Sequence, residues 1–140
     1  MNTAIVRTLA TLCLIAALGS IGLMAQGPIQ ATIPFDFTIG KTSFTAGEYV
    51  VRPNMSQSVL AIQSVDGRSA AMTLTNAVQA SKMSPKARLI FNRYGDRYFL
   101  SQVWAPGNQG RELSPSVAER ELMAKTTSTE AVILVASSNK

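Results

Sequence analysis

The chain has 140 residues, a net charge of +5 at pH 7, one cysteine and no histidine. With a single cysteine, Cys13, no disulfide can form within the chain, and without histidine it lacks the side chain that most often transfers protons near neutral pH. The soft ligands of a typical zinc or copper site are missing as well. We therefore expect a protein that is not an enzyme, and we expect no metal and no cofactor.

The first 25 residues predict an export signal. Arg7 precedes an apolar run from Leu9 to Leu23, and Ala25 stands before a polar break. This order is typical of a secretory signal peptide, and the run is shorter than the roughly 20 residues that cross a bilayer comfortably. An uncleaved anchor and cleavage after Gly19 or Ala31 are the alternatives. We expect an exported protein that is periplasmic or extracellular.

Cleavage at this point defines two segments: a signal peptide at 1–25 and a single β-rich domain at 26–140. We expect no integral membrane span after cleavage. The charges of the second segment are scattered, and the one short basic stretch holds Lys82, Lys86 and Arg88. A solvated surface explains this pattern best, so we expect no nucleic-acid partner.

Apolar and polar residues alternate in short segments from Thr32 onward, and this pattern predicts an antiparallel, mostly β domain. The expected strands cover residues 32–39, 44–52, 59–65, 70–77, 88–93 and 97–104. Two turns are typical of hairpins, namely Asp66-Gly67 and Tyr94-Gly95-Asp96. The polar segments 79–86 and 106–110 predict an exposed loop and a flexible loop.

A helix and a last strand are expected near the C-terminus. Ser116 with Glu119 fits a capping box, Ser114 with Pro115 is an alternative start, and the helix then runs to about Lys125. Its apolar side is thin, so it should cover a barrel end or a sheet edge. The apolar run 131–136 predicts a strand that is buried on both faces and pairs with the first strand.

These elements together predict an all-β, mainly antiparallel fold. The expected architecture is a small β-barrel or β-sandwich meander with one short C-terminal helix before the last strand. A closed barrel would leave no exposed strand edges, which matters for an exported protein that must avoid aggregation.

The candidate binding residues are large, amphipathic or charged and cluster around the second hairpin. They are Arg93, Tyr94, Asp96, Arg97 and Tyr98, followed by Trp104 and Arg111. Tyr, Trp and Arg often dominate contacts with proteins and glycans. The structural alternative is that the tyrosines brace the hairpin as cross-strand partners while the arginines lie in water.

Two other functions stay open. A small hydrolase could use Asp36 and Glu48 as a carboxylate pair, although solvated strand residues explain both better, and a Ser–Lys dyad is a weaker variant built from Ser81, Ser84, Lys82 and Lys86. A small-ligand carrier would instead need an apolar barrel cavity lined by residues such as Phe35, Phe37, Leu89 and Phe91. A core filled by those side chains would count against the carrier.

Five short motifs carry a resemblance to a known family. They are Ile33–Phe37, Phe44–Tyr49, Tyr94–Leu100, Gly110–Leu113 and Ala118–Glu121. In combination they resemble a family of small exported proteins found in acidobacteria and related soil bacteria, over nearly all of residues 26–140. The resemblance implies one module of the cell envelope and supplies no activity. We expect a binding or structural protein whose partner is an envelope protein or a glycan.

Overall fold

The structure is a computed structural model that describes residues 27–54 and 57–138. The expected signal peptide at 1–25 lies outside these residues. The elements, in chain order, are β1 (Ile29–Ile33), β2 (Phe37–Ile39), β3 (Thr42–Phe44), β4 (Gly47–Asn54), β5 (Val59–Ser64), β6 (Ala70–Ser84), β7 (Ala87–Tyr94), β8 (Arg97–Trp104), β9 (Gly107–Leu113), α2 (Val117–Lys125) and β10 (Glu130–Ser138).

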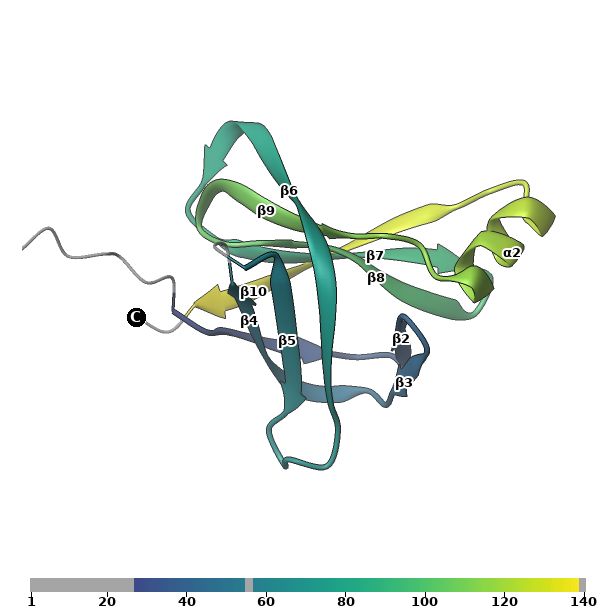
Figure 1. The fold of residues 1–140 in the computed structure, drawn as a ribbon, viewed down its shortest axis with the longest axis horizontal. Coiled ribbons are helices and arrows are strands. Elements are labelled where there is room, and N and C mark those ends of the chain that lie inside the picture. The colour runs from purple at the N-terminus through teal and green to yellow at the C-terminus, as the bar shows by residue number, and fades with distance from the viewer. Residues whose placement is uncertain (1–26, 55–56, 139–140) are drawn as a thin grey trace, which may run out of the picture.

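Eight of these strands close into an antiparallel barrel (Figure 1). Around the ring the order is β1, β4, β5, β6, β9, β8, β7, β10 and again β1. Outside the ring, β2 pairs in parallel with β8 through Thr38 and Phe99, and β3 pairs with β2. The expected all-β fold is confirmed as a barrel. The first strand pairs with the last, as expected, but through Ile29 and Gln30, which precede the predicted start at residue 32.

The barrel consists of two meanders, β4–β5–β6 and β7–β8–β9, which β1 and β10 join on one side. On the other side β6 pairs with β9 and not with β7, the next strand in the sequence. Only Pro85 and Lys86 connect β6 to β7, although these two strands are not neighbours in the ring. Among the described residues, no helix is long and apolar enough to cross a membrane.

Alternate residues of most wall strands point inward and fill the barrel, whereas β6 buries only Thr75 and β10 only Ala136. Leu89 and Phe91 of β7 are fully buried, as is Val103 of β8, which lies directly opposite Leu89. Burying one such side chain contributes about 1.5–3 kcal/mol relative to leaving it in water. Because the side chains of a strand alternate between its faces, the period-two pattern in the sequence becomes the boundary between core and surface.

Both predicted hairpins are confirmed. β5 and β6 are joined through Asp66-Gly67, and Gly67 has φ +76°. β7 and β8 are joined through Gly95-Asp96, and Gly95 has φ +64°. Glycine adopts such positive φ angles without the steric cost that a side chain imposes.

Two segments that the sequence predicts as loops are strands. β6 continues to Ser84, through most of the segment 79–86, and Ser81, Lys82 and Met83 are exposed as expected. β9 begins at Gly107, inside the segment 106–110. Both predictions were wrong because β6 and β9 pair with each other, and a partner strand outweighs a local preference for turns.

The last strand differs from its expected burial. Ile133 and Val135 of β10 are 56% and 65% exposed, whereas Leu134 between them points into the barrel. The prediction that this strand is buried on both faces was therefore wrong. A continuous apolar run indicates burial on both faces when helices cover a sheet, but no layer covers the outside of the barrel here.

Candidate functional site

The seven predicted binding residues do not form one surface. Around the β7–β8 turn, Asp96 and Arg97 are exposed. Arg93 forms an ion pair of 3.4 Å with Glu130, and its guanidinium lies 5.5 Å from the ring centre of Tyr98. These contacts resemble the structural alternative more than a shared binding face, because each arginine is held by its own hairpin or a neighbouring strand.

Tyr98 and Tyr94 leave the hairpin on opposite sides. The ring of Tyr98 stacks on Phe35 with centroids 3.9 Å apart, against the barrel core. Tyr94 is buried on the other side, where its ring meets Phe99 edge to face at 5.8 Å. The two tyrosines are therefore not cross-strand partners, and neither presents its ring to solvent as a binding residue would.

Glu119 is the residue that holds α2 on the hairpin. Its Oε1 accepts hydrogen bonds from the Tyr94 hydroxyl at 3.0 Å and from Nδ2 of Asn92 at 3.1 Å, and its side chain is 5% exposed. The expected cap is confirmed, because Oγ of Ser116 accepts from the Glu119 amide at 3.2 Å. The capping-box pattern predicts only the contact with Ser116, and the burial of Glu119 has no local signal because its other partners lie about 25 residues earlier in the chain.

The hydrogen bonds of Glu119 with Tyr94 and Asn92, which we call the helix clamp, change the acidity of Tyr94. Burial disfavours the phenolate, and the negative charge of Glu119 disfavours it further, so the pKa of Tyr94 is raised above its ordinary value of 10.0. Tyr94 therefore remains a neutral hydrogen-bond donor across the physiological range. The hydrogen bond between Tyr94 and Glu119 thus fastens the helix to the β7–β8 hairpin.

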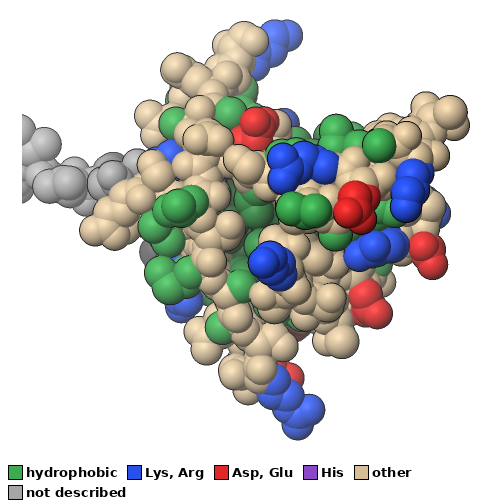
Figure 2. Space-filling view, turned by 45° about the vertical axis from the view of Figure 1, so that its right-hand side comes forward, with side chains coloured by type: hydrophobic (Ala, Val, Ile, Leu, Met, Phe, Trp, Pro, Cys, Tyr) green, Lys and Arg blue, Asp and Glu red, His purple; other side chains and the backbone are tan. Residues whose placement is uncertain are grey.

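The outer face of β7, β8 and β10 carries a second group of interacting side chains, which we call the outer wall and define as Arg88, Ile90, Trp104, Ile133 and Val135. Arg88 lies directly between Val135 and Trp104, and Ile90 lies beside Ile133. The Arg88 guanidinium is 5.5 Å from the ring centre of Trp104, a distance at which cation–π attraction is significant. Figure 2 shows one face of the molecule on which hydrophobic side chains reach the surface next to Lys and Arg side chains.

Hydrogen bonds fix the position of Trp104 in this wall. Its indole Nε1 donates to Oε1 of Gln102 at 3.0 Å, and Nε2 of Gln102 donates to Glu112 at 2.8 Å. The ring lies so close to Gly110 that an added Cβ would come within 2.6 Å of it. Trp104 is only 8% exposed, so it stiffens the wall and presents little of its ring to solvent.

Arg111 is separated from the rest of the predicted site because it is buried inside the barrel wall. It is 4% exposed and pairs with Val103, whose side chain points into the barrel. Along β9, Arg111 lies on the opposite face of the sheet from Gly110, which packs against Trp104. The charged character of Arg111 gave no signal of this placement, since arginine is usually exposed.

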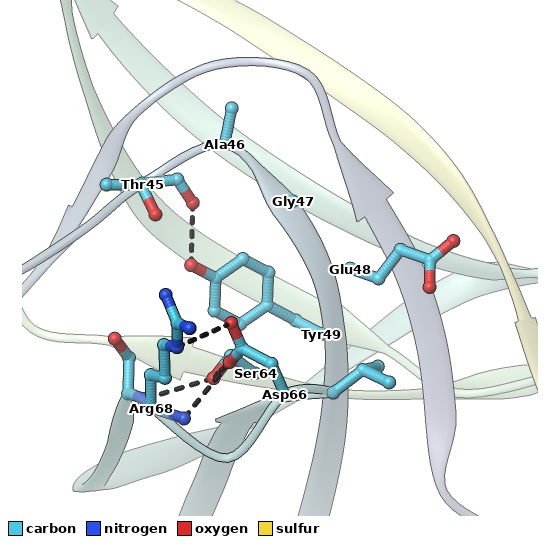
Figure 3. Close-up of a pocket in the computed structure, with 10 residues that line it drawn as sticks. Thr45, Ala46, Gly47, Glu48, Tyr49, Ser64, Asp66 and Arg68 are labelled. Atoms are coloured by element: carbon cyan, nitrogen blue, oxygen red, sulfur yellow. Dashed lines mark hydrogen bonds and ion pairs between the residues drawn. The ribbon is translucent and has the colours of Figure 1, made fainter.

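The two carboxylates proposed for a hydrolase lie in different parts of the fold, Asp36 between β1 and β2 and Glu48 on β4. Asp36 is exposed, and its Oδ1 accepts a hydrogen bond from the Ala46 amide at 2.9 Å. Glu48 is exposed on β4 and lines a hollow of about 430 Å³, shown in Figure 3, to which Asp36 does not contribute. The structure therefore does not bring Asp36 and Glu48 together in one pocket.

The hollow of Figure 3 is built by the β5–β6 turn. Asp66 accepts hydrogen bonds from Ser64 Oγ at 2.6 Å and from the Arg68 amide at 3.0 Å. These two hydrogen bonds, the first more than the second, lower the pKa of Asp66. Tyr49 donates to the carbonyl of Thr45 at 2.6 Å. The polar groups that face the hollow are thus engaged in holding the turn, as turn chemistry predicts.

The residues expected to form a Ser–Lys dyad or a carrier cavity are also engaged in contacts within the fold. Ser84 Oγ donates to the carbonyl of Lys86 at 3.2 Å, so this hydroxyl serves the local backbone. Phe37 packs against Phe91 with ring centres 5.5 Å apart, and Phe35 meets Phe91 at 5.0 Å. The side chains expected to line a carrier cavity thus pack on one another, and Leu89 is buried beside them.

In the part of the chain that the structure describes, no three Asp, Glu, Cys or His side chains come together in a way that could hold a metal ion. Comparisons with models of protein families, with curated proteins and with solved structures found no match for this chain. The resemblance to exported acidobacterial proteins therefore stays a prediction, and the function has to be argued from the geometry.

Proposed function

We propose that this protein is an exported, non-catalytic binding module that engages another protein of the envelope or extracellular space through its outer wall. The observation that carries the proposal is the contrast between a filled interior and an exposed apolar exterior. Phe37, Leu89 and Phe91 are buried in one hydrophobic core, while Ile133 and Val135 are more than half exposed on the outside. Apolar side chains that gather on a surface often mark an interaction site.

The surroundings of these side chains favour a protein partner. Arg is enriched at protein interfaces, and here Arg88 lies between Val135 and Trp104, the latter of which is almost wholly covered and supports the wall from within. The hydrogen bonds from Trp104 to Gln102 and onward hold the wall in one arrangement. A rigid surface loses less conformational entropy when it binds.

A groove beside the wall supplies a concave feature. It has a volume of about 600 Å³, lies at the junction of β1 and β10, and includes Val135 in its lining. β1 and β10 pair only through Ile29 with Ser138 and Gln30 with Ser137, so the two strands separate beyond these pairs. Part of a partner could enter this groove while the rest covers Ile133 and Ile90.

The first test is the mass of the protein under native conditions after isolation from its own host. We expect the bare chain together with a complex of the chain and a macromolecular partner. A stoichiometric small molecule that is released on denaturation would contradict the proposal and establish a carrier, whose ligand would have to occupy the barrel.

A pair of matched variants tests the wall itself. We expect Ile133→Thr combined with Val135→Thr to abolish the complex, because the change removes exposed apolar area and keeps β-branched residues. The control is Met72→Thr combined with Leu74→Thr, since these two side chains are 75% exposed on β6, in another part of the barrel exterior. Loss of the complex in both variants, or in neither, would contradict the assignment of the wall.

A further inference from the structure

A groove between α2 and the β2–β3 turn is lined by cationic side chains from three separate elements. Lys41 lies in the β2–β3 turn, Arg97 begins β8, and Arg120 lies in the N-terminal half of α2. The groove has a volume of about 650 Å³, which falls in the usual range for small-molecule sites. It shares no residue with the outer wall.

These cations are not neutralised by the chain. The ion pairs of the described residues join Arg68 to Asp66 and Arg93 to Glu130, so none includes Lys41, Arg97 or Arg120. Glu121 is the one carboxylate in the lining, which leaves the groove a net charge of +2. Three like charges brought together around a hollow repel one another, and an anion between them would relieve this repulsion.

The start of α2 adds hydrogen-bond donors to the same groove. Ser116, the N-cap, accepts from the amide of Glu119 through its side chain and from the amide of Arg120 through its carbonyl. The amides of Val117 and Ala118 precede these bonds, and both residues line the groove. Such amides at a helix N-terminus, with the positive end of the helix dipole, attract anions.

One of the three cations, Arg97, also contacts an aromatic ring of the chain. The guanidinium of Arg97 lies 5.2 Å from the ring centre of Phe99, which is buried. This contact limits the rotamers of Arg97 and reduces the entropy that binding would cost. The hydroxyl groups of Thr38, Ser43 and Ser116 are also in the lining and can donate to further oxygen atoms.

We propose that this groove is a binding site for a phosphate group carried by a larger molecule. A phosphate offers several oxygen acceptors to donors that approach from different directions, as the side chains and amides of this groove do. The volume exceeds the need of a single phosphate, so the rest of the ligand has room beside Pro115 and Val117. The group can be part of a soluble phosphorylated compound or of an anionic lipid headgroup.

The proposal is tested by titrating the purified protein with inorganic phosphate and with glycerol phosphate while amide resonances are recorded, at constant ionic strength in chloride. We expect saturable shifts at the amides of Val117, Ala118 and Gly40. Shifts that do not saturate, or that are spread over the barrel, would overturn the proposal.

Charge variants show whether the groove is responsible. We expect Lys41→Gln combined with Arg120→Gln to weaken phosphate binding about tenfold or more, since each change removes a charge-assisted contact. The control is Arg52→Gln combined with Lys82→Gln, two exposed cations outside the groove lining that change the net charge equally. Equal weakening by both pairs would indicate non-specific attraction and overturn the proposal.

Vesicles distinguish the two sources of the phosphate. Binding to phosphatidylglycerol vesicles but not to phosphatidylcholine vesicles, with loss in the Lys41 and Arg120 variant, would assign a lipid headgroup. Binding of glycerol phosphate without vesicle binding would assign a soluble compound. Failure of both probes would overturn the proposal of a phosphate site. It would not affect the proposed protein partner of the outer wall, because the wall variants are tested on a separate complex.

Discussion

The two faces of β7 and β10 carry similar side chains in opposite surroundings. Leu89 and Phe91 point inward and are fully buried, whereas Ile133 and Val135 point outward and remain mostly exposed. The difference teaches that a strand in a barrel contributes only its alternate residues to the core. Apolar residues on the other face add little to folding, and under the proposed function they contact a partner.

The inner face can be tested by removing its largest buried side chain. We expect Phe91→Ala to lower the free energy of unfolding by about 3–5 kcal/mol, because it removes an aromatic ring that is fully buried and leaves a cavity. Chemical denaturation with urea measures this change. A loss below about 1 kcal/mol would mean that the interior is not packed as described.

The helix clamp should rank second. We expect Glu119→Ala to lower the free energy of unfolding by about 2–4 kcal/mol, because the buried hydroxyl of Tyr94 and the partly buried amide of Asn92 would lose their acceptor. Tyr94→Phe supplies the control, since it removes one donor together with its need for an acceptor. If the effects of the two variants add fully in the double variant, the proposed hydrogen bond does not contribute.

The packing of the outer wall can be altered at Gly110. We expect Gly110→Ala to cost about 1–3 kcal/mol, because the new Cβ would come within 2.6 Å of the Trp104 ring. Trp104 is the only tryptophan of the chain, so its fluorescence reports the displacement directly. An unchanged emission spectrum would contradict the close contact.

The free energy of unfolding should fall at high pH because of Tyr94. The pKa of Tyr94 is raised in the folded protein, so the folded state keeps a proton that the unfolded state loses above about pH 10. The stabilisation is complete below that pH and declines as the pH rises through the folded pKa, by at most about 1.4 kcal/mol per pH unit. Comparing the unfolding of the native protein and of Tyr94→Phe at high pH measures it. Parallel curves would refute the assignment.

The smallest effect is expected on the outer face. Ile133→Thr combined with Val135→Thr should change the free energy of unfolding by less than about 1 kcal/mol, since both side chains are mostly exposed and threonine keeps the β-branched shape. Denaturation under the conditions used for Phe91→Ala tests this. A loss as large as that of Phe91→Ala would show that this face belongs to the core.

Much of the fold could be predicted where local chemistry is decisive. Asp66-Gly67 and Gly95 identify two hairpins because few residues other than glycine tolerate positive φ angles. Ser116 identifies the start of the helix because its hydroxyl accepts from an amide three residues later. These signals involve residues close together in the chain, so they can be recognised before any tertiary contact is known.

The candidate sites could be predicted only in part. Arg97 and Trp104 were singled out by residue type, but the structure separates them, with Arg97 in the cationic groove beside α2 and Trp104 in the outer wall. Lys41 and Arg120 gave no signal because nothing in the sequence places the β2–β3 turn beside α2. Clusters of distant residues are set by the fold and not by spacing along the chain.

The sequence by itself determined the alternation of the strands, the two tight hairpins, the helix cap and the absence of histidine. Only the tertiary structure decided that β6 pairs with β9, that Glu119 is buried against Tyr94 and that Arg111 is buried in the barrel wall. The physical reason is the range of the interactions. Turns and caps depend on backbone angles and neighbouring side chains, whereas strand partners and burial depend on how the whole barrel closes.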